Sequence, residues 1–184
     1  MKKIVLLGLT AFATFTLCSC DAFNSLKDLV EGKEQYKFND FKALVANRNL
    51  SFTATKCTGS FDTDGAKKEV EYTYNVEDSK WHYDYVITVM GEEITSDGTK
   101  DLFLVDEIKN FYDTIDKNKI DKYYKFYATK KEYTIEYSYK DDDVQVESTY
   151  VYGEDGLIIS GDIKSTDLKE VRTYVTKESY KYSK

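Results

Sequence analysis

Residues 80–89 read KWHYDYVITV, and residues 68–76 read KEVEYTYNV. In both segments large apolar side chains alternate with polar ones, which is the period of two expected of a β-strand with one buried face. One face of segment 80–89 carries Trp81, Tyr83 and Tyr85. The stretch between the segments is short and consists of Glu, Asp and Ser, as in hairpin turns. We therefore expect the two segments to be antiparallel neighbours in one sheet.

The same alternation recurs to the end of the chain. Further strands of this kind are predicted at 50–57, 122–129, 132–140, 144–152, 157–165 and 170–181, and the apolar run LFLV (102–105) predicts a short buried strand. The stretches between them are rich in Gly, Asp and Lys, and Asp64-Gly65 is an Asp-Gly pair typical of a hairpin turn. This pattern predicts about nine strands in a long antiparallel meander.

Two segments have a helical period instead. Residues 40–47 place Phe41, Leu44 and Val45 on one face, at spacings of three and four. Residues 106–117 repeat this arrangement with apolar residues at 108, 111, 112 and 115. Such a stripe is typical of an amphipathic helix that packs on a core. We expect one short helix before the strands and one inserted among them.

The composition agrees with a mainly β protein that does not bind nucleic acid. The chain has 17 Tyr and no Pro, and Tyr is enriched in strands because it suits a half-buried pleated surface. It carries 33 acidic and 26 basic residues, for a net charge of −7. An acidic chain without a basic patch repels phosphate backbones, so a nucleic-acid partner is not expected.

The N-terminus resembles a bacterial lipoprotein signal. Two lysines precede the uncharged segment 4–17, which is too short to span a bilayer and has the length of a signal-peptide core. The sequence then reads Leu17-Cys18-Ser19-Cys20, which is similar to a lipobox with Leu at −3 and a small residue at −1. The resemblance implies cleavage before Cys20 and attachment of diacylglycerol to its sulfur.

This interpretation divides the chain into three parts. Residues 1–19 are the predicted signal peptide, 20–39 a lipid-anchored polar tether, and 40–184 a single antiparallel β domain. The protein is then expected to be extracytoplasmic and held on the bacterial cell membrane by its lipid. Cys57 is left as the one free thiol, so no intramolecular disulfide is expected.

The order of elements also resembles the unclosed β-barrel lipoproteins of the LolA/LppX/LprG kind, on the lipobox and on the stretches FKALVANRNLSFTAT (41–55) and GEDGLIIS (153–160). The resemblance implies a strongly curved antiparallel sheet, or half-barrel, whose concave side is plugged by helices. It carries over no functional residue. The alternative architecture is a β-sandwich, since a sheet with one apolar face must cover that face by some form of packing.

Aromatic residues form the candidate ligand site. The residues concerned are Tyr72, Tyr74, Trp81, Tyr83, Tyr85, Tyr137 and Tyr139. Such rings usually form core, but phenol groups seek hydrogen bonds, so a face this rich in Tyr suits an apolar or amphipathic, lipid-like ligand. The function expected is therefore non-enzymatic binding of such a ligand. The alternative is a surface interaction or display module with a closed core and no small-molecule ligand.

Sequence patterns for metal or catalytic chemistry are weak. Residues 60–71 match several positions of a calcium loop, but their Asp-Gly pair equally fits a hairpin turn. A Cys57–His82 pair would form a nucleophile and base only if the two strands lie close, and no third group is evident to orient it. We therefore expect no catalytic residue, no metal site and no cofactor.

Overall fold

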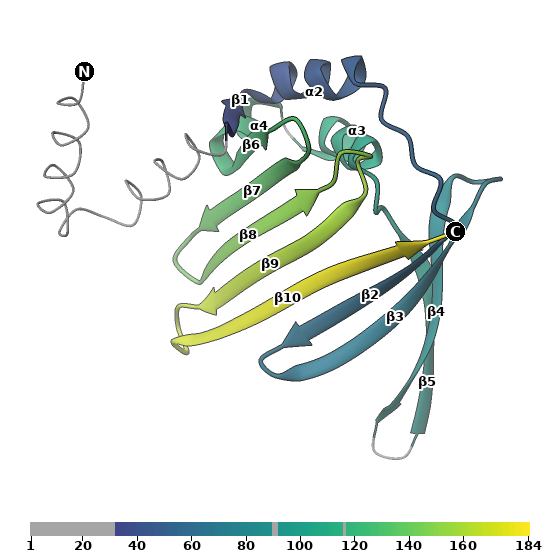
Figure 1. Ribbon diagram of the computed structural model, residues 1–184. Helices are drawn as coiled ribbons and strands as arrows, with labels where there is room; N and C mark the ends of the chain where they lie inside the picture. The colour runs from purple at the N-terminus through teal and green to yellow at the C-terminus, as the bar shows by residue number, and fades with distance from the viewer. Residues whose placement is uncertain (1–31, 90–91, 116) are drawn as a thin grey trace, which may run out of the picture. The chain divides into compact units, whose positions relative to one another are not determined.

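The computed structural model describes residues 32–89, 92–115 and 117–184. The predicted signal peptide, Cys20 and most of the tether lie outside these residues. Residues 35–184 form one compact unit, built on a single ten-stranded antiparallel sheet that does not close into a barrel (Figure 1). The predicted mainly β fold with an unclosed, curved sheet is confirmed. The alternative β-sandwich is wrong, because the strands make one sheet and not two.

The sheet consists of two meanders joined side by side. The strands are β1 (Glu34–Tyr36), β2 (Lys56–Thr63), β3 (Ala66–Asn75), β4 (Lys80–Val89), β5 (Glu92–Lys100), β6 (Tyr124–Ala128), β7 (Tyr133–Lys140), β8 (Val144–Tyr152), β9 (Ile158–Asp167) and β10 (Arg172–Ser183). Their spatial order is β1-β6-β7-β8-β9-β10-β2-β3-β4-β5. The last strand, β10, therefore pairs with β2 from the start of the domain. Figure 1 shows the sheet turning, from β6–β9 viewed on their face to β4 and β5 viewed on edge.

Three helices accompany the sheet in the described residues: α2 (Phe38–Asn47), α3 (Leu104–Thr114) and α4 (Lys117–Tyr123). They gather near one end of β6–β9 (Figure 1). We call the sheet surface on which they pack the inner face. There Phe41 of α2 lies with its ring centroid 5.1 Å from that of Phe126 on β6, and Phe111 of α3 lies 4.7 Å from Tyr124. Phe41 and Phe126 are fully buried, so these rings form the centre of the core.

The leading helix begins earlier than the sequence predicts. Its first residue, Phe38, is buried, and the Phe38 backbone N–H donates to Asp121 Oδ1 at 2.9 Å. A carboxylate at a helix N-terminus satisfies a free amide and interacts well with the helix dipole. Because Asp121 belongs to α4, 83 residues along the chain, this cap leaves no local pattern. The helix ends at Asn47, as the predicted bounds 40–47 have it, and Asn49 just beyond it has a positive φ of 48°.

Three strands also differ from prediction. The predicted strand 50–57 is an extended segment that packs on the core, and the strand itself is β2, at 56–63. The predicted strand 102–105 is wrong, since Phe103 makes only one isolated bridge, to Leu157, and α3 begins at Leu104. Strand β5 was not predicted, because the positions facing Tyr85 and Tyr83 of β4 are Ser96 and Gly98. With Ile94 as its one large apolar residue, this strand shows no hydrophobic alternation.

Tyrosine rings lie over glycines at three places on the inner face. The cross-strand pairs are Tyr83 with Gly98, Tyr150 with Gly161, and Tyr180 with Gly59. A Cβ added at Gly161 would lie 2.7 Å from a Tyr150 ring carbon, and one at Gly98 would lie 2.8 Å from the Tyr83 hydroxyl. Real Cβ atoms do not approach so closely. The glycines therefore leave space for the rings to lie flat along the sheet. In this way large side chains pack on a curved surface.

This arrangement predicts the effect of Gly161→Ala. Ala normally suits a strand better than Gly, but here the methyl group would collide with the Tyr150 ring. We expect a loss of about 1–3 kcal/mol in the free energy of unfolding, measured by urea denaturation. In a Tyr150→Leu background the cost of Gly161→Ala should shrink clearly. An equal cost in both backgrounds would show that the ring contact is not the cause.

Candidate functional site

A pocket of about 370 Å³ opens on the inner face, and all the residues that line it belong to strands. Its lining residues are Phe61, Thr63, Lys68, Val70, Tyr72, Tyr83, Tyr85, Thr99, Lys100 and Thr176. Nine of them come from β2, β3, β4 and β5, and the pairing of β10 with β2 adds Thr176. We call it the inner-face pocket.

Stacked tyrosines form one wall of the inner-face pocket. The rings of Tyr83 and Tyr85, two residues apart on β4, lie 5.7 Å apart at an interplanar angle of 20°. Tyr72 meets Tyr83 edge-on, with centroids 5.6 Å apart. Tyr83 and Tyr85 are only half-buried, so they offer aromatic surface to a ligand. Aromatic walls with a few polar groups are the usual composition of small-molecule pockets.

Lys68 lies against this wall. Its Nζ is 3.2 Å from the centroid of the Tyr85 ring, a cation–π contact. A hydrogen bond with Lys68 lowers the pKa of the Tyr85 phenol below its ordinary value, and Ser96 contributes in the same direction. The cross-strand neighbour of Lys68 is Phe61. The ammonium group therefore sits among rings at the edge of the pocket.

Lys100, the second lysine of the pocket, belongs to a polar chain whose other members do not line the pocket. Lys100 Nζ donates to the Tyr180 hydroxyl, which in turn donates to Glu178 Oε2 at 2.6 Å. Lys100 also lies 3.4 Å from Glu178, whose side chain is only 9% exposed. Burial, followed by the hydrogen bond to Glu178, raises the pKa of Tyr180 far above its ordinary value. The phenol therefore stays protonated and links the two charges, as a buried ion pair requires.

The predicted aromatic residues separate into three groups. Tyr72, Tyr83 and Tyr85 line the inner-face pocket, as described above. Trp81 is a core residue at 2% exposure, and Tyr74 packs against it with centroids 5.3 Å apart. Both rings also contact Phe52, whose centroid lies 5.0 Å from that of Tyr74 and 5.7 Å from that of Trp81. This is the ordinary core role of such rings.

The remaining two predicted residues lie in the other meander. Tyr139 donates to Asp141 at 2.9 Å in the β7–β8 turn. Tyr137 lines a small cavity of about 110 Å³ together with Glu107, Phe111, Tyr124, Ile135, Ser148, Tyr150 and Tyr152. The structure therefore does not bring Tyr137 and Tyr139 into the inner-face pocket.

Glu107 of α3 is the acidic group in this small cavity. Burial, with the nearby charge of Asp101, raises the pKa of its carboxyl above the ordinary value of 4.5, against an opposing effect of Lys100. Burial also raises the pKa of Tyr150 to about 12. The cavity therefore holds phenols and a carboxyl in surroundings that favour their neutral forms.

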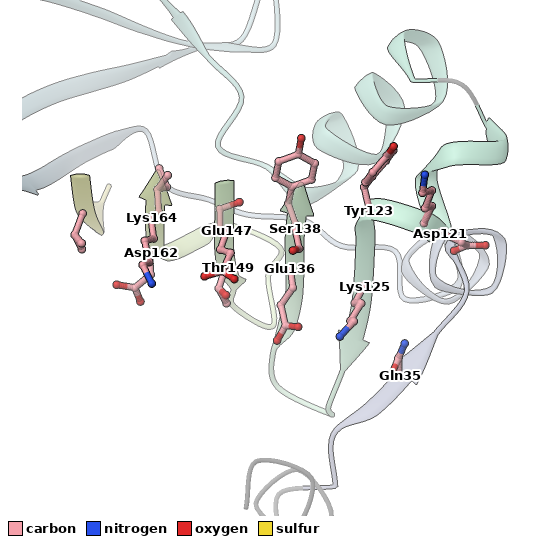
Figure 2. Close-up of a pocket in the computed structure, with 15 residues that line it drawn as sticks. Gln35, Asp121, Tyr123, Lys125, Glu136, Ser138, Glu147, Thr149, Asp162 and Lys164 are labelled. Carbon is pink, nitrogen blue, oxygen red and sulfur yellow. The ribbon is translucent and has the colours of Figure 1, made fainter. Parts of the chain in front are cut away.

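A larger hollow, of about 550 Å³, lies on the opposite, outer face of the sheet. Figure 2 shows its side chains in rows across neighbouring strands. Lys125 faces Glu136, and Glu147 faces Lys164, in direct cross-strand register. Opposite charges in such pairs support strand register by roughly 0.2–1 kcal/mol. Because strand pairing accounts for these charges and no stacked rings line the hollow, we take the smaller inner-face pocket as the candidate site.

The weaker sequence patterns have structural roles. Residues 60–71 span the β2–β3 hairpin, where Asp62 Oδ1 accepts from the Gly65 backbone N–H at 2.9 Å. In the described part of the chain no group of three or more acidic, Cys or His side chains is placed to hold a metal ion. Cys57 is buried on the inner face, and burial raises the pKa of its thiol to about 11. His82 lies on the outer face, where its Nε2 donates to Asp78 Oδ2 at 2.6 Å. Cys57 and His82 therefore do not form a pair.

Sequence reasoning missed Lys68, Lys100, Phe61 and Thr176 as pocket residues. Lys68 and Lys100 look like ordinary solvent-facing lysines in the sequence, and β5, which carries Lys100, was itself not predicted. Thr176 is more than 100 residues from Phe61, and only the pairing of β10 with β2 brings them together. The one available signal was the spacing of two between Lys68, Val70 and Tyr72, which places these three residues on the same face of the strand.

Comparison of the sequence with protein-family models and with curated proteins finds no match. Among the residues that the structure describes, no helix combines the length and apolar character needed to cross a bilayer. The site is therefore judged on its own geometry.

We predict a pH-dependent effect of Glu107→Gln. The folded chain binds the Glu107 proton more tightly than the unfolded chain, so stability from this group is present at low pH and is lost as pH rises. The variant should raise the free energy of unfolding at pH 7 and change it little near pH 4, measured by urea denaturation. Asp113→Asn, at an exposed acid of the same helix, is the control. A gain as large at pH 4 as at pH 7 would contradict the burial argument.

Proposed function

We propose that the chain is a membrane-anchored extracytoplasmic lipoprotein that binds a small amphipathic, lipid-like ligand without catalysis. The observation that supports this proposal is the inner-face pocket, in which two stacked, half-buried tyrosines stand beside lysine side chains. Rings accept an apolar body, and ammonium groups accept a polar end. The membrane part of the proposal depends on the lipobox-like stretch that ends at Cys20.

The size of the pocket limits the ligand. Small-molecule sites usually measure about 300–1,000 Å³, and the inner-face pocket, at about 370 Å³, is at the lower end of this range. It suits one acyl chain or one ring system better than a lipid with several chains. The alternative function, a display module with a closed core, would not need a pocket of this size. The polar outer face remains available to a protein partner in either case.

Tyr85→Ala should weaken ligand binding through loss of ring surface. With N-phenyl-1-naphthylamine, a neutral fluorescent probe, we expect affinity to fall about fivefold or more. Tyr127→Ala is the matched control, because Tyr127 lies on the outer face opposite Thr134. Binding is measured by fluorescence titration on the full chain, and organic extracts of protein from the native host are analysed by mass spectrometry. Absence of probe binding together with a ligand-free extract would refute the proposal.

Cys20→Ala should abolish anchoring. If the sulfur of Cys20 carries diacylglycerol, its removal takes away the acyl chains that hold the protein on the bilayer. We expect the variant to move from the detergent phase to the aqueous phase in a phase-partitioning experiment on material from the native host. Cys57→Ala, at the buried thiol, is the control and should remain in the detergent phase. Equal partitioning of both variants would contradict lipidation at Cys20.

A further inference from the structure

We infer that the ligand of the inner-face pocket is an anion and that Lys68 is the residue that binds its negative group. This inference rests on the proposed function, because it names the chemical class of the same ligand. It concerns amphipathic molecules that end in a carboxylate, sulfonate or phosphate.

The charge of the pocket supports an anionic ligand. Its lining includes two lysines and no acidic side chain, although the whole chain carries a net charge of −7. The lining residues are therefore positively charged in a chain that is acidic overall. A pocket with one sign of charge and walls of low polarity attracts ligands of the opposite sign.

Lys100 is not the free charge. Its Nζ donates to the Tyr180 hydroxyl and lies 3.4 Å from the Glu178 carboxylate. Because Glu178 is almost fully buried, moving Lys100 toward a ligand would leave a buried carboxylate without its counter-charge, which is unfavourable. Lys100 is therefore committed to the wall of the pocket.

Lys68 is in the opposite situation. Among the side chains that the structure describes, no carboxylate lies within ion-pair distance of its ammonium group, which contacts the Tyr85 ring instead. Its cross-strand neighbour, Phe61, is aromatic as well. A cation–π contact with a ring stabilises an ammonium group less than a charge-assisted hydrogen bond to an anion does. A ligand whose apolar body lies on Tyr83 and Tyr85 would bring its charged end within reach of Lys68.

The test compares two probes on three lysine variants. The full chain carrying Cys20→Ala is titrated with 1-anilinonaphthalene-8-sulfonate, an anion, and with the neutral N-phenyl-1-naphthylamine. Lys68→Met keeps the straight apolar stem and removes the charge, whereas Lys68→Arg keeps the charge. Lys67→Met is the matched control, because Lys67 is exposed and faces Asp62 on the outer side of the sheet. Urea denaturation checks that every variant is folded.

Lys68→Met should lower the affinity for the anionic probe by on the order of tenfold and leave that for the neutral probe nearly unchanged. Lys68→Arg should retain most of the anion binding, and Lys67→Met should match the parent protein. If Lys68→Met and Lys67→Met bind the anion equally well, the role of Lys68 is refuted, while neutral-probe binding that Tyr85→Ala weakens still supports the pocket. If neither probe binds the parent protein, both the inference and the proposed function fail.

Discussion

The structure depends on tyrosine rings that lie flat over glycines across neighbouring strands. Tyr83 covers Gly98, Tyr150 covers Gly161, and Tyr180 shares the space above Gly59. A sheet that curves toward one face crowds the side chains on that face, and at these three pairs a large ring lies opposite the smallest residue. Glycine costs conformational entropy in a strand, and the rings offset this cost by covering the bare backbone.

The same constraint explains why the inner face has a filled end and an open end. Helices α2 and α3 bury Phe41 and Phe111 against β6, where a conventional hydrophobic core forms. Over β2–β5 the rings of Tyr83 and Tyr85 lie along the sheet and leave a pocket in front of them. Beside the pocket, Lys100, Tyr180 and Glu178 satisfy one another's charge and hydrogen bonds.

Most of the sheet could be predicted from local pattern. Strands β3, β4, β7 and β8 alternate large apolar and polar residues, and their short Asp- and Gly-containing turns permit only antiparallel neighbours. Strand β5 could not be found in this way, because Gly98 and Ser96 occupy its inner positions. These small residues leave space for the rings of Tyr83 and Tyr85 on β4. The true start of α2 was hidden for a related reason, since its cap, Asp121, comes from another helix.

By itself, the sequence determined that the folded chain is mainly β, antiparallel and rich in rings on one face, because side-chain period and turn chemistry are local properties. It also pointed to Tyr72, Tyr83 and Tyr85, which do line the pocket. Only the tertiary structure decided that β10 pairs with β2, that Lys68 and Lys100 join these rings, and that Trp81 is core. Those outcomes depend on contacts between residues far apart in the chain, and local periodicity carries no information about which distant strands become neighbours.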